Sequence, residues 1–470
     1  MRGYRPGFVG LVMLLALGFT GSMPAQEPQL LVLSEIEERI AGELAFTILE
    51  QELAAGGFRL VADERVSAIG RNLTTYSDRP HLHYAFWVIE GDMPPRAFSL
   101  PGGHVCVSRT LLEQICQTDA DVAFVLGHEI AHSALRHYAD YALLDGQQVA
   151  YVQDLLQRRN PLNLLTGNPA AALDDVAAAV AVEQILLPYM VKVRQLKEIE
   201  SDQFGTLYAL RAGYDFSGGF QVLRRLQERY GEDFELEGFD DILNLDASLE
   251  SAGEHPDLSL RLEQLEYFRI KALEVARLFP LGRDALDRGD YREAALVFES
   301  ILSLFPQSRT AHIGLGVAYH LQYWDSSPGD DFLLAYPGAL EVEYIYLLER
   351  GPHDLGALRR AIDQYQQVLN VEPGNSYARN NMGVALAELQ QAEQAEHALR
   401  ESLRLSERDF TMFNLGLLLA RKQARIQDPT QRTRLKTEAL ALMNAYLQHI
   451  PHDPVAAQYV EELTGAGADK

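Results

Sequence analysis

The chain has 470 residues, of which 47% are hydrophobic and 23% are charged, a composition typical of a globular protein with room for two or three domains. Its formal net charge of −25 at pH 7 argues against binding nucleic acid or an anionic membrane through a basic surface. We therefore expect no nucleic-acid partner, and we interpret the acidic balance as a source of solubility.

The N-terminus has the pattern of a secretory signal peptide. Two arginines precede an uncharged apolar run over residues 7–23, and small residues follow. We expect residues 1–25 to be this signal, cleaved after Ala25 or Ser22, which predicts an exported protein. An uncleaved membrane anchor is the alternative, although the apolar run is short for a membrane span.

The two cysteines of the chain are Cys106 and Cys116. An exported protein can form a disulfide, and Cys106 falls in a predicted strand shortly before Cys116. The sequence leaves open whether they are bridged. Their spacing suits no common thiolate zinc site, so we do not expect them to bind a metal.

The first folded part is predicted to combine helices with a short sheet. Residues 83–90 and 99–107 are rich in β-branched and aromatic residues, a pattern typical of strands. Residues 33–75 are predicted to be helical because apolar residues recur near a 3.6-residue period, namely Ile36, Ile40, Leu44, Ile48 and Leu53.

The most informative string is His-Glu-Ile-Ala-His at residues 128–132, which follows an apolar run typical of a buried helix. His128 and His132 share one helix face, and two imidazoles at this spacing can bind one zinc ion. Glu129 points in another direction, where it can take a proton from a metal-bound water. The alternative is a helix whose histidines cap its end or face solvent.

A third ligand is predicted on a second helix. Glu198 and Asp202 are one helical turn apart, so Glu198 can complete a site of two histidines and one glutamate. Asp202 can hydrogen-bond the outer nitrogen of a ligating histidine. Glu200 is the competing ligand, but it points about 200 degrees away from Glu198 around the helix. Without the histidine motif, an acidic segment of this kind is more often a solvated face.

These motifs resemble the membrane-associated and periplasmic zinc metalloendopeptidases, whose third ligand opens a Glu-x-x-x-Asp motif. Within that family the chain looks most like the bacterial β-barrel assembly-enhancing proteases, which join this catalytic domain to tetratricopeptide repeats. The resemblance covers roughly residues 33–275 and departs from the family at Arg96 and Ser201, where Asn and Ala are usual. Further matching strings are Ala97–Val107, Arg136-His137, and His255-Pro256 with Arg261.

The resemblance implies that the strand with Pro101, Gly102 and Gly103 is an edge strand that holds an extended peptide substrate through main-chain hydrogen bonds. A plain turn before a strand is the alternative. His255 follows a glycine-containing loop, so it is either a gating residue or fourth metal ligand, or a histidine at a helix start. Residues 138–190 are interpreted as a lid over the cleft or as packing.

From residue 276 to about residue 465 the pattern is that of tetratricopeptide repeats. The marker glycines Gly316, Gly383 and Gly416 are 67 and 33 residues apart, close to two periods and one. We therefore interpret residues 324–352 as a degenerate repeat, which lines a partner groove or caps the catalytic domain. Stacked helix pairs form a concave surface, which we expect to bind a protein partner.

Together these features predict an α+β fold, with a mainly helical zinc metallopeptidase domain and small sheet over residues 33–275, then an all-α repeat solenoid over residues 276–465. The resemblance implies a periplasmic zinc endopeptidase that cleaves misfolded or stalled outer-membrane proteins and associates peripherally with their assembly machinery, given a Gram-negative source. The main alternative is a chaperone or scaffold protein whose peptidase domain is repressed.

Overall fold

The computed structural model describes residues 33–137, 197–231, 257–325 and 354–465, together with Phe234, Leu333 and Leu334. The predicted signal peptide, the expected lid over residues 138–190, and His255 lie outside the described residues. Within the described ranges, none of the helices combines the length and the apolar character that a membrane span requires.

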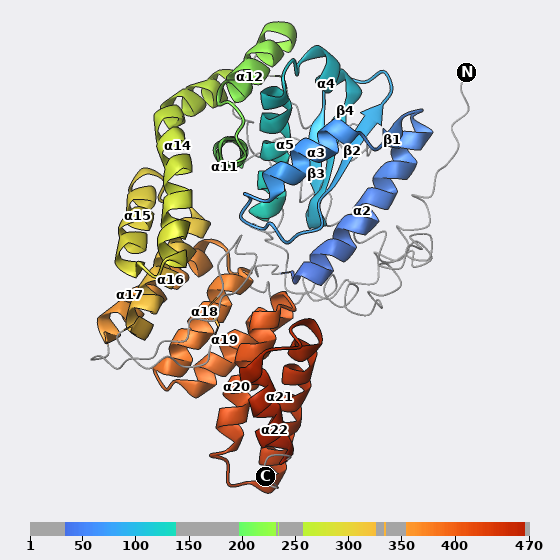
Figure 1. Ribbon diagram of the computed structural model, residues 1–470. Helices are drawn as coiled ribbons and strands as arrows, with labels where there is room; N and C mark the ends of the chain where they lie inside the picture. Colours follow the sequence, from blue (N-terminus) through green and yellow to red (C-terminus); the bar gives the residue numbers. More distant parts are fainter. Residues whose placement is uncertain are drawn as a thin grey trace, which may run out of the picture.

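A mainly helical region with one four-stranded sheet comes first (Figure 1). The sheet order is β1-β2-β4-β3, in which β2 and β4 are parallel and the other neighbours are antiparallel. Its strands are β1 (Arg59–Val61), β2 (Ala85–Glu90), β3 (Ala97–Leu100) and β4 (His104–Ser108). Its helices are α2 (Glu35–Ala55), α3 (Glu64–Thr74), α4 (Arg109–Gln114), α5 (Asp119–Ala134), α11 (Glu198–Arg211) and α12 (Ser217–Tyr230).

Helix α5, which carries the histidine motif, begins at a capping box. The Thr118 side chain accepts from the Asp121 N–H, and the Asp121 carboxylate accepts from the Thr118 N–H. These bonds satisfy backbone donors that a helix N-terminus leaves without partners. Almost every residue of α5 is buried, so the motif is held in the interior rather than on a solvated face.

The prediction of one strand over residues 99–107 is wrong. Pro101, Gly102 and Gly103 form a buried 3-10 turn that separates β3 from β4. Proline has no N–H for a ladder, and the positive φ angles of Gly102 and Gly103, 74° and 100°, suit glycine. The turn packs against α2, where a Cβ on Gly42 would lie 1.9 Å from the Pro101 carbonyl oxygen. The glycine pair therefore allows close packing on a helix, and the three residues assigned to a substrate strand are not in a strand.

The helical prediction for residues 33–75 is correct for α2 and α3 but misses β1 between them. The second half of the molecule consists of stacked helices that extend away from the sheet (Figure 1). They are α14 (Leu258–Asp287), α15 (Tyr291–Leu304), α16 (Arg309–Asp325), α17 (Leu355–Val371), α18 (Ser376–Glu388), α19 (Ala392–Leu405), α20 (Asp409–Gln423), α21 (Pro429–His449) and α22 (Pro454–Thr464).

Most of the expected degenerate repeat, residues 326–332 and 335–352, lies outside the described residues. Helices α16 and α17 pack directly against each other, and α17 packs on α18. Gly316 lies in α16 and Gly383 in α18. The expected domain boundary at residue 275 lies inside α14, which packs against α11 and α12 as well as α15.

The sheet-containing region and the stacked helices share one apolar core. A single cluster of buried side chains runs from the sheet through α5 and α11 into the helix pairs and includes Leu126, Phe204, Phe268 and Phe305. A continuous buried apolar cluster of this kind fixes how the second region stands relative to the first.

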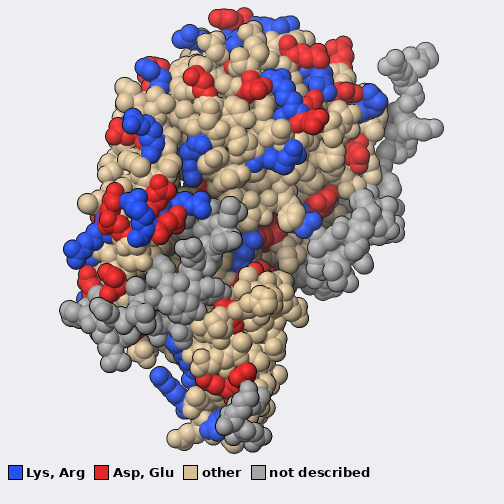
Figure 2. All heavy atoms as spheres, in the orientation of Figure 1, with Lys and Arg blue, Asp and Glu red and all other residues tan. Residues whose placement is uncertain are grey.

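On the face shown in Figure 2, Lys and Arg side chains are interspersed with Asp and Glu.

Candidate metal centre

Two glycines let α5 and α11 cross with their backbones almost in contact. A Cβ on Gly205 would lie 2.4 Å from the His128 backbone nitrogen, and one on Gly127 would lie 2.6 Å from the Gly205 carbonyl oxygen. Any larger residue would push the helices apart. Glu198, Asp202 and Gly205 are spaced i, i+4 and i+7, so they lie along one face of α11. The close crossing therefore brings the two acids to the histidines.

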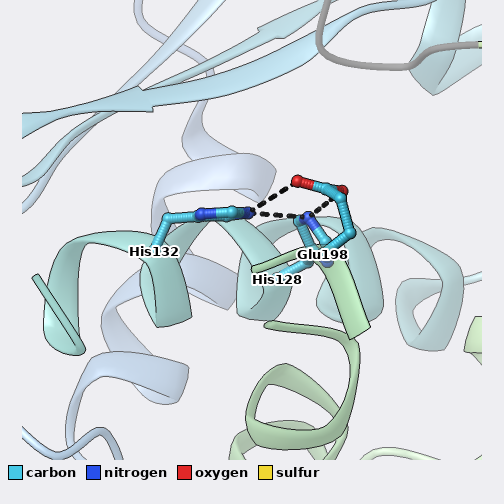
Figure 3. A group of neighbouring side chains, drawn as sticks. All are labelled: His128, His132 and Glu198. Carbon is cyan, nitrogen blue, oxygen red and sulfur yellow. Dashed lines mark hydrogen bonds and ion pairs between the residues drawn. The ribbon is translucent and has the colours of Figure 1, made fainter. Parts of the chain in front are cut away.

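His128, His132 and Glu198 converge on one point (Figure 3). The Nε2 atoms of His128 and His132 are 3.1 Å apart. Glu198 places Oε2 3.3 Å from the first nitrogen and Oε1 3.4 Å from the second. All three side chains are buried, and they are the one such convergent group found in the part of the chain that the structure describes. These residues can hold a divalent metal ion.

The outer nitrogen of His128 is fixed by Asp202. The His128 Nδ1 lies 2.8 Å from Asp202 Oδ1, and Arg261 of α14 donates to both oxygens of that carboxylate at 2.8 Å. Burial opposes ionisation of Asp202, but the Arg261 charge and these hydrogen bonds outweigh it and lower the pKa of Asp202. An ionised Asp202 accepts the Nδ1 proton, so the Nε2 lone pair of His128 points to the cluster.

His132 is oriented through a second histidine. Its Nδ1 lies 3.2 Å from the Nδ1 of His137, whose Nε2 lies 3.5 Å from Glu200 Oε2. Burial lowers the pKa of His137 to about 4, so the ring is neutral near pH 7. The contacts are satisfied when His132 donates to His137 and His137 directs its own N–H toward Glu200. That tautomer also leaves the His132 Nε2 lone pair pointing to the cluster.

Glu200, the competing ligand, is engaged elsewhere. Lys197 donates to it at 2.9 Å, and Arg309 of α16 lies 3.2 Å away. Burial opposes its ionisation, but the hydrogen bond with His137 and the charges of Arg309 and Lys197 together lower the pKa of Glu200. Glu200 therefore orients a histidine from a distance and is not in the convergent group.

The remaining predicted residues have clear positions. Glu129 lies on α5 next to His128 and is fully buried. Strand β3 is an edge strand of the described sheet. Its last residue contacts α5, because Ser133 Oγ donates a hydrogen bond to the Leu100 carbonyl at 3.4 Å.

Cys106 and Cys116 are free buried thiols, so they are not bridged.

The repeat helices hold the helix that carries Glu198. Thr310 of α16 donates its hydroxyl to Asp78 Oδ1 at 2.5 Å, and Tyr208 of α11 donates to the other oxygen at 2.6 Å. The Phe204 and Phe305 rings pack 4.9 Å apart beside these bonds. Sequence reasoning assigned nothing to Asp78 or Tyr208, because each partner is more than a hundred residues away.

Comparison with known proteins identifies the family of the first region. Residues 61–269 match peptidase family M48, and residues 279–322 match a tetratricopeptide repeat. Residues 61–269 are a peptidase family M48 domain. The predicted enzyme class, a metallopeptidase, and the predicted α+β domain followed by helical repeats are confirmed.

The similarity to characterised relatives is limited in extent. The chain is 25% identical over 170 residues to the putative beta-barrel assembly-enhancing protease of Vibrio cholerae, which covers 36% of this chain and 34% of the relative. It is 28% identical over 186 residues to the mitochondrial metalloendopeptidase OMA1 of Saccharomyces cerevisiae, and this match covers 38% of this chain and 45% of the relative. The matches thus span less than half the length of these relatives.

Among solved structures, the chain is similar to a tetratricopeptide-repeat protein of Thermus thermophilus, with 14% sequence identity and a TM-score of 0.29. The match covers 58% of this chain and 94% of the Thermus protein.

Proposed function

We propose that this protein is an exported zinc metalloendopeptidase that cleaves misfolded or stalled proteins, with its repeat array as a docking module. The observation that carries the proposal is the convergence of His128, His132 and Glu198 inside an M48 domain. Both histidines have their outer nitrogens oriented by polar partners, as metal-ligating histidines do.

The spacing of the ligand atoms supports zinc. Atoms bound tetrahedrally at about 2.05 Å lie about 3.3 Å from one another, because that is the edge of such a tetrahedron. The 3.1 Å between the two Nε2 atoms is close to this edge, and each nitrogen has one Glu198 oxygen at 3.3 or 3.4 Å, so one ion can reach all three side chains. Calcium prefers six to eight oxygen ligands at longer distances. Three protein ligands leave a fourth position for water or substrate.

The chemistry follows from the residues around this position. When bound, zinc would polarise the scissile carbonyl and make water more acidic. Glu129 is the base that takes the proton from the attacking water and passes it to the leaving amine. Asp202 and Arg261 keep His128 in the ligating tautomer, and His137 with Glu200 does the same for His132.

Unfolded protein is the substrate class that this site suits. Strand β3 is an edge of the described sheet and lies against α5, so an extended peptide can pair with its main chain near the metal ligands. Main-chain pairing selects for an extended backbone rather than for a particular sequence. A folded substrate cannot offer such a strand until it opens.

The cellular setting is proposed on two grounds. The N-terminal pattern of arginines, apolar run and small residues favours export. The similarity to the beta-barrel assembly-enhancing protease favours a periplasmic location and substrates among outer-membrane proteins, with peripheral association with their assembly machinery.

The test compares Glu129→Gln with the parent protein on reduced, unfolded casein. We expect the variant to keep about one zinc per chain but to lose cleavage, since the metal ligands remain while the base is gone. His132→Ala is the matched control and should lose both. Equal cleavage by parent and Glu129→Gln would show that Glu129 is not the base. Full complementation of a deletion strain by Glu129→Gln would favour the scaffold alternative instead.

A further inference from the structure

The contacts that orient His132 extend beyond the peptidase domain. His132 contacts His137, and His137 contacts Glu200 of α11. The next group is Arg309 of α16, whose Nη1 donates to Glu200 Oε1 at 3.2 Å. The match to the peptidase family ends at residue 269, so Arg309 belongs to the repeat array. The corresponding contacts of the other histidine end at Arg261, which lies inside the match.

Arg309 is fixed by its own surroundings. Its side chain is 2% exposed. Its Nε lies 3.5 Å from Glu372 Oε2, and its guanidinium carbon lies 5.7 Å from the centre of the Phe204 ring. Glu372 in turn accepts from Asn375 Nδ2 at 3.1 Å. A planar guanidinium held on several sides has a defined position, from which it can hold a carboxylate in place.

Glu200 has a conformational freedom that Arg309 restricts. The Glu200 side chain is 20% exposed, so its carboxylate can turn toward water. Its two oxygens have different partners, because Oε1 faces Arg309 whereas Oε2 faces Lys197 and His137. Opposite charges attract each other more strongly away from water. The buried guanidinium therefore keeps the carboxylate turned inward, where its second oxygen can accept from His137.

The same part of the array also holds the backbone next to His137. Arg136, the preceding residue, donates to the Gly374 carbonyl at 3.1 Å, and Gly374 lies two residues after Glu372 in the turn between α17 and α18. Another nitrogen of Arg136 lies 3.3 Å from Glu38. The φ angle of Arg136 is 55°, a left-handed conformation that residues other than glycine seldom adopt. These contacts help to hold that conformation and so fix where His137 lies.

We propose that Arg309 is a positioning residue for the metal ligand His132, and that the repeat array thereby completes the metal centre. Arg309 contacts neither the metal ligands nor the substrate, and it acts through Glu200 and His137. This inference rests on the zinc site proposed above and gives the array a second role besides docking. A peptidase domain without the array would contain all three ligands and would still bind zinc more weakly.

The test measures the zinc affinity of the full-length protein in a competition with a fluorescent chelator. Arg309→Gln should weaken zinc affinity about three- to tenfold, less than the loss of about 10–100-fold that follows when a direct partner of a ligand is removed. Arg309→Lys keeps the charge without the forked donors, so it should recover part of the loss. Arg408→Gln is the matched control. It removes another arginine of the array that pairs with a carboxylate of the first region, Glu35 at 2.7 Å, and it should leave zinc affinity unchanged.

A double-mutant cycle distinguishes positioning from general support of the fold. In a Glu200→Gln background, Arg309→Gln should weaken zinc affinity by less than about twofold, because the group through which Arg309 acts is already gone. A merely structural role would give the same loss in both backgrounds. If circular dichroism shows that Arg309→Gln is unfolded, Arg309→Lys takes its place in both backgrounds with the same expectation.

The inference is overturned if the Arg309 variant binds zinc as tightly as the parent, if its effect is equal with and without Glu200, or if Arg408→Gln weakens zinc affinity as much. Each of these results leaves the casein test of Glu129 unaffected. A parent protein that binds no zinc would instead overturn the proposed function, and this inference with it.

Discussion

The metal centre and three buried asparagines of the repeat helices, Asn380, Asn381 and Asn414 of α18 and α20, are both polar, yet they consist of opposite kinds of group. At the metal centre, the carboxyl groups of Glu198 and Asp202 and the guanidinium of Arg261 surround two imidazoles. In the repeat helices, the groups that contact the main chain of Leu333 are uncharged amides. Buried carboxyl and imidazole groups suit a cation, whereas buried amides complement a peptide backbone.

The two sites also differ in what holds them. The metal ligands come from two helices whose crossing is set by glycines, and each histidine is oriented by a chain of polar contacts. The asparagines come from helices at equivalent repeat positions, so the geometry follows from the stacking itself. We therefore expect changes in helix packing to damage the metal centre most.

Gly205→Ala should have the largest effect. Its Cβ would meet the backbone of His128 at 2.4 Å, and backbone atoms cannot turn aside as a side chain can. We expect α11 to move away from α5, zinc content to fall sharply, and the protein to lose about 3 kcal/mol of stability. Zinc analysis and thermal unfolding measure both.

Gly356→Ala is the matched control for Gly205→Ala. Gly356 lies at an exposed position in α17, and a Cβ there would meet a side-chain oxygen rather than backbone atoms. It should leave zinc unchanged and stabilise slightly. Normal zinc content in Gly205→Ala would mean that the close helix crossing is not what assembles the site.

Asp202→Asn should have an intermediate effect on metal affinity. The amide keeps the shape of Asp202 but no longer demands the Nδ1 proton of His128, so the ligating tautomer is less favoured. We expect zinc affinity to fall about 10–100-fold in a competition with a fluorescent chelator. Glu200→Gln acts on His132 only through His137, so it should weaken zinc affinity less than Asp202→Asn does. An equal or larger loss would contradict the indirect role assigned to Glu200.

Glu35→Gln should have the smallest effect, and the effect should depend on pH. Glu35 of α2 lies 2.7 Å from Arg408 of the repeat array and 3.6 Å from Arg79. Burial opposes its ionisation, but the charges of Arg79 and Arg408 prevail and lower the pKa of Glu35. The ionised form thus stabilises the folded state above the ordinary glutamate pKa, and this contribution is lost as pH falls through the lowered value.

We therefore expect Glu35→Gln to cost about 1–2 kcal/mol at pH 7 and progressively less below about pH 4.5. Thermal midpoints of parent and variant across this range are the measurement. Ser303→Ala, at an exposed position of α15, is a control without pH dependence. A constant difference between parent and Glu35→Gln would mean that the charge of Glu35 does not join the two regions.

Much of the metal centre could be predicted because its information is local. His128 and His132 are one turn apart, and Glu198 and Asp202 repeat that spacing on a second helix. Arg261 was indicated only by the family resemblance, through its spacing from His255-Pro256. Arg309 and Asp78 gave no signal, since their partners are distant in sequence and are brought near only by packing. The buried asparagines of the repeat helices did leave a signal, because Asn381 and Asn414 precede the marker glycines by the same interval.

Elements with a regular apolar period were predicted correctly, whereas the short elements were missed. The three residues of β1 are too few to show alternation between two flanking helices. The turn at Pro101 was hidden because β-branched and aromatic residues lie on both sides of it. The expected degenerate repeat falls between α16 and α17, and most of its residues lie outside the described part of the chain, so it stays a prediction.

The 30-residue helix α14 limits how such a protein can be recombined. Near its start it supplies Arg261 to the metal centre, and near its end it packs on the first repeat helix, α15. A chimaera that gave this peptidase a different array would have to be joined beyond Asp287. A junction at residue 275 would cut the continuous helix that links the metal centre to the repeat helices.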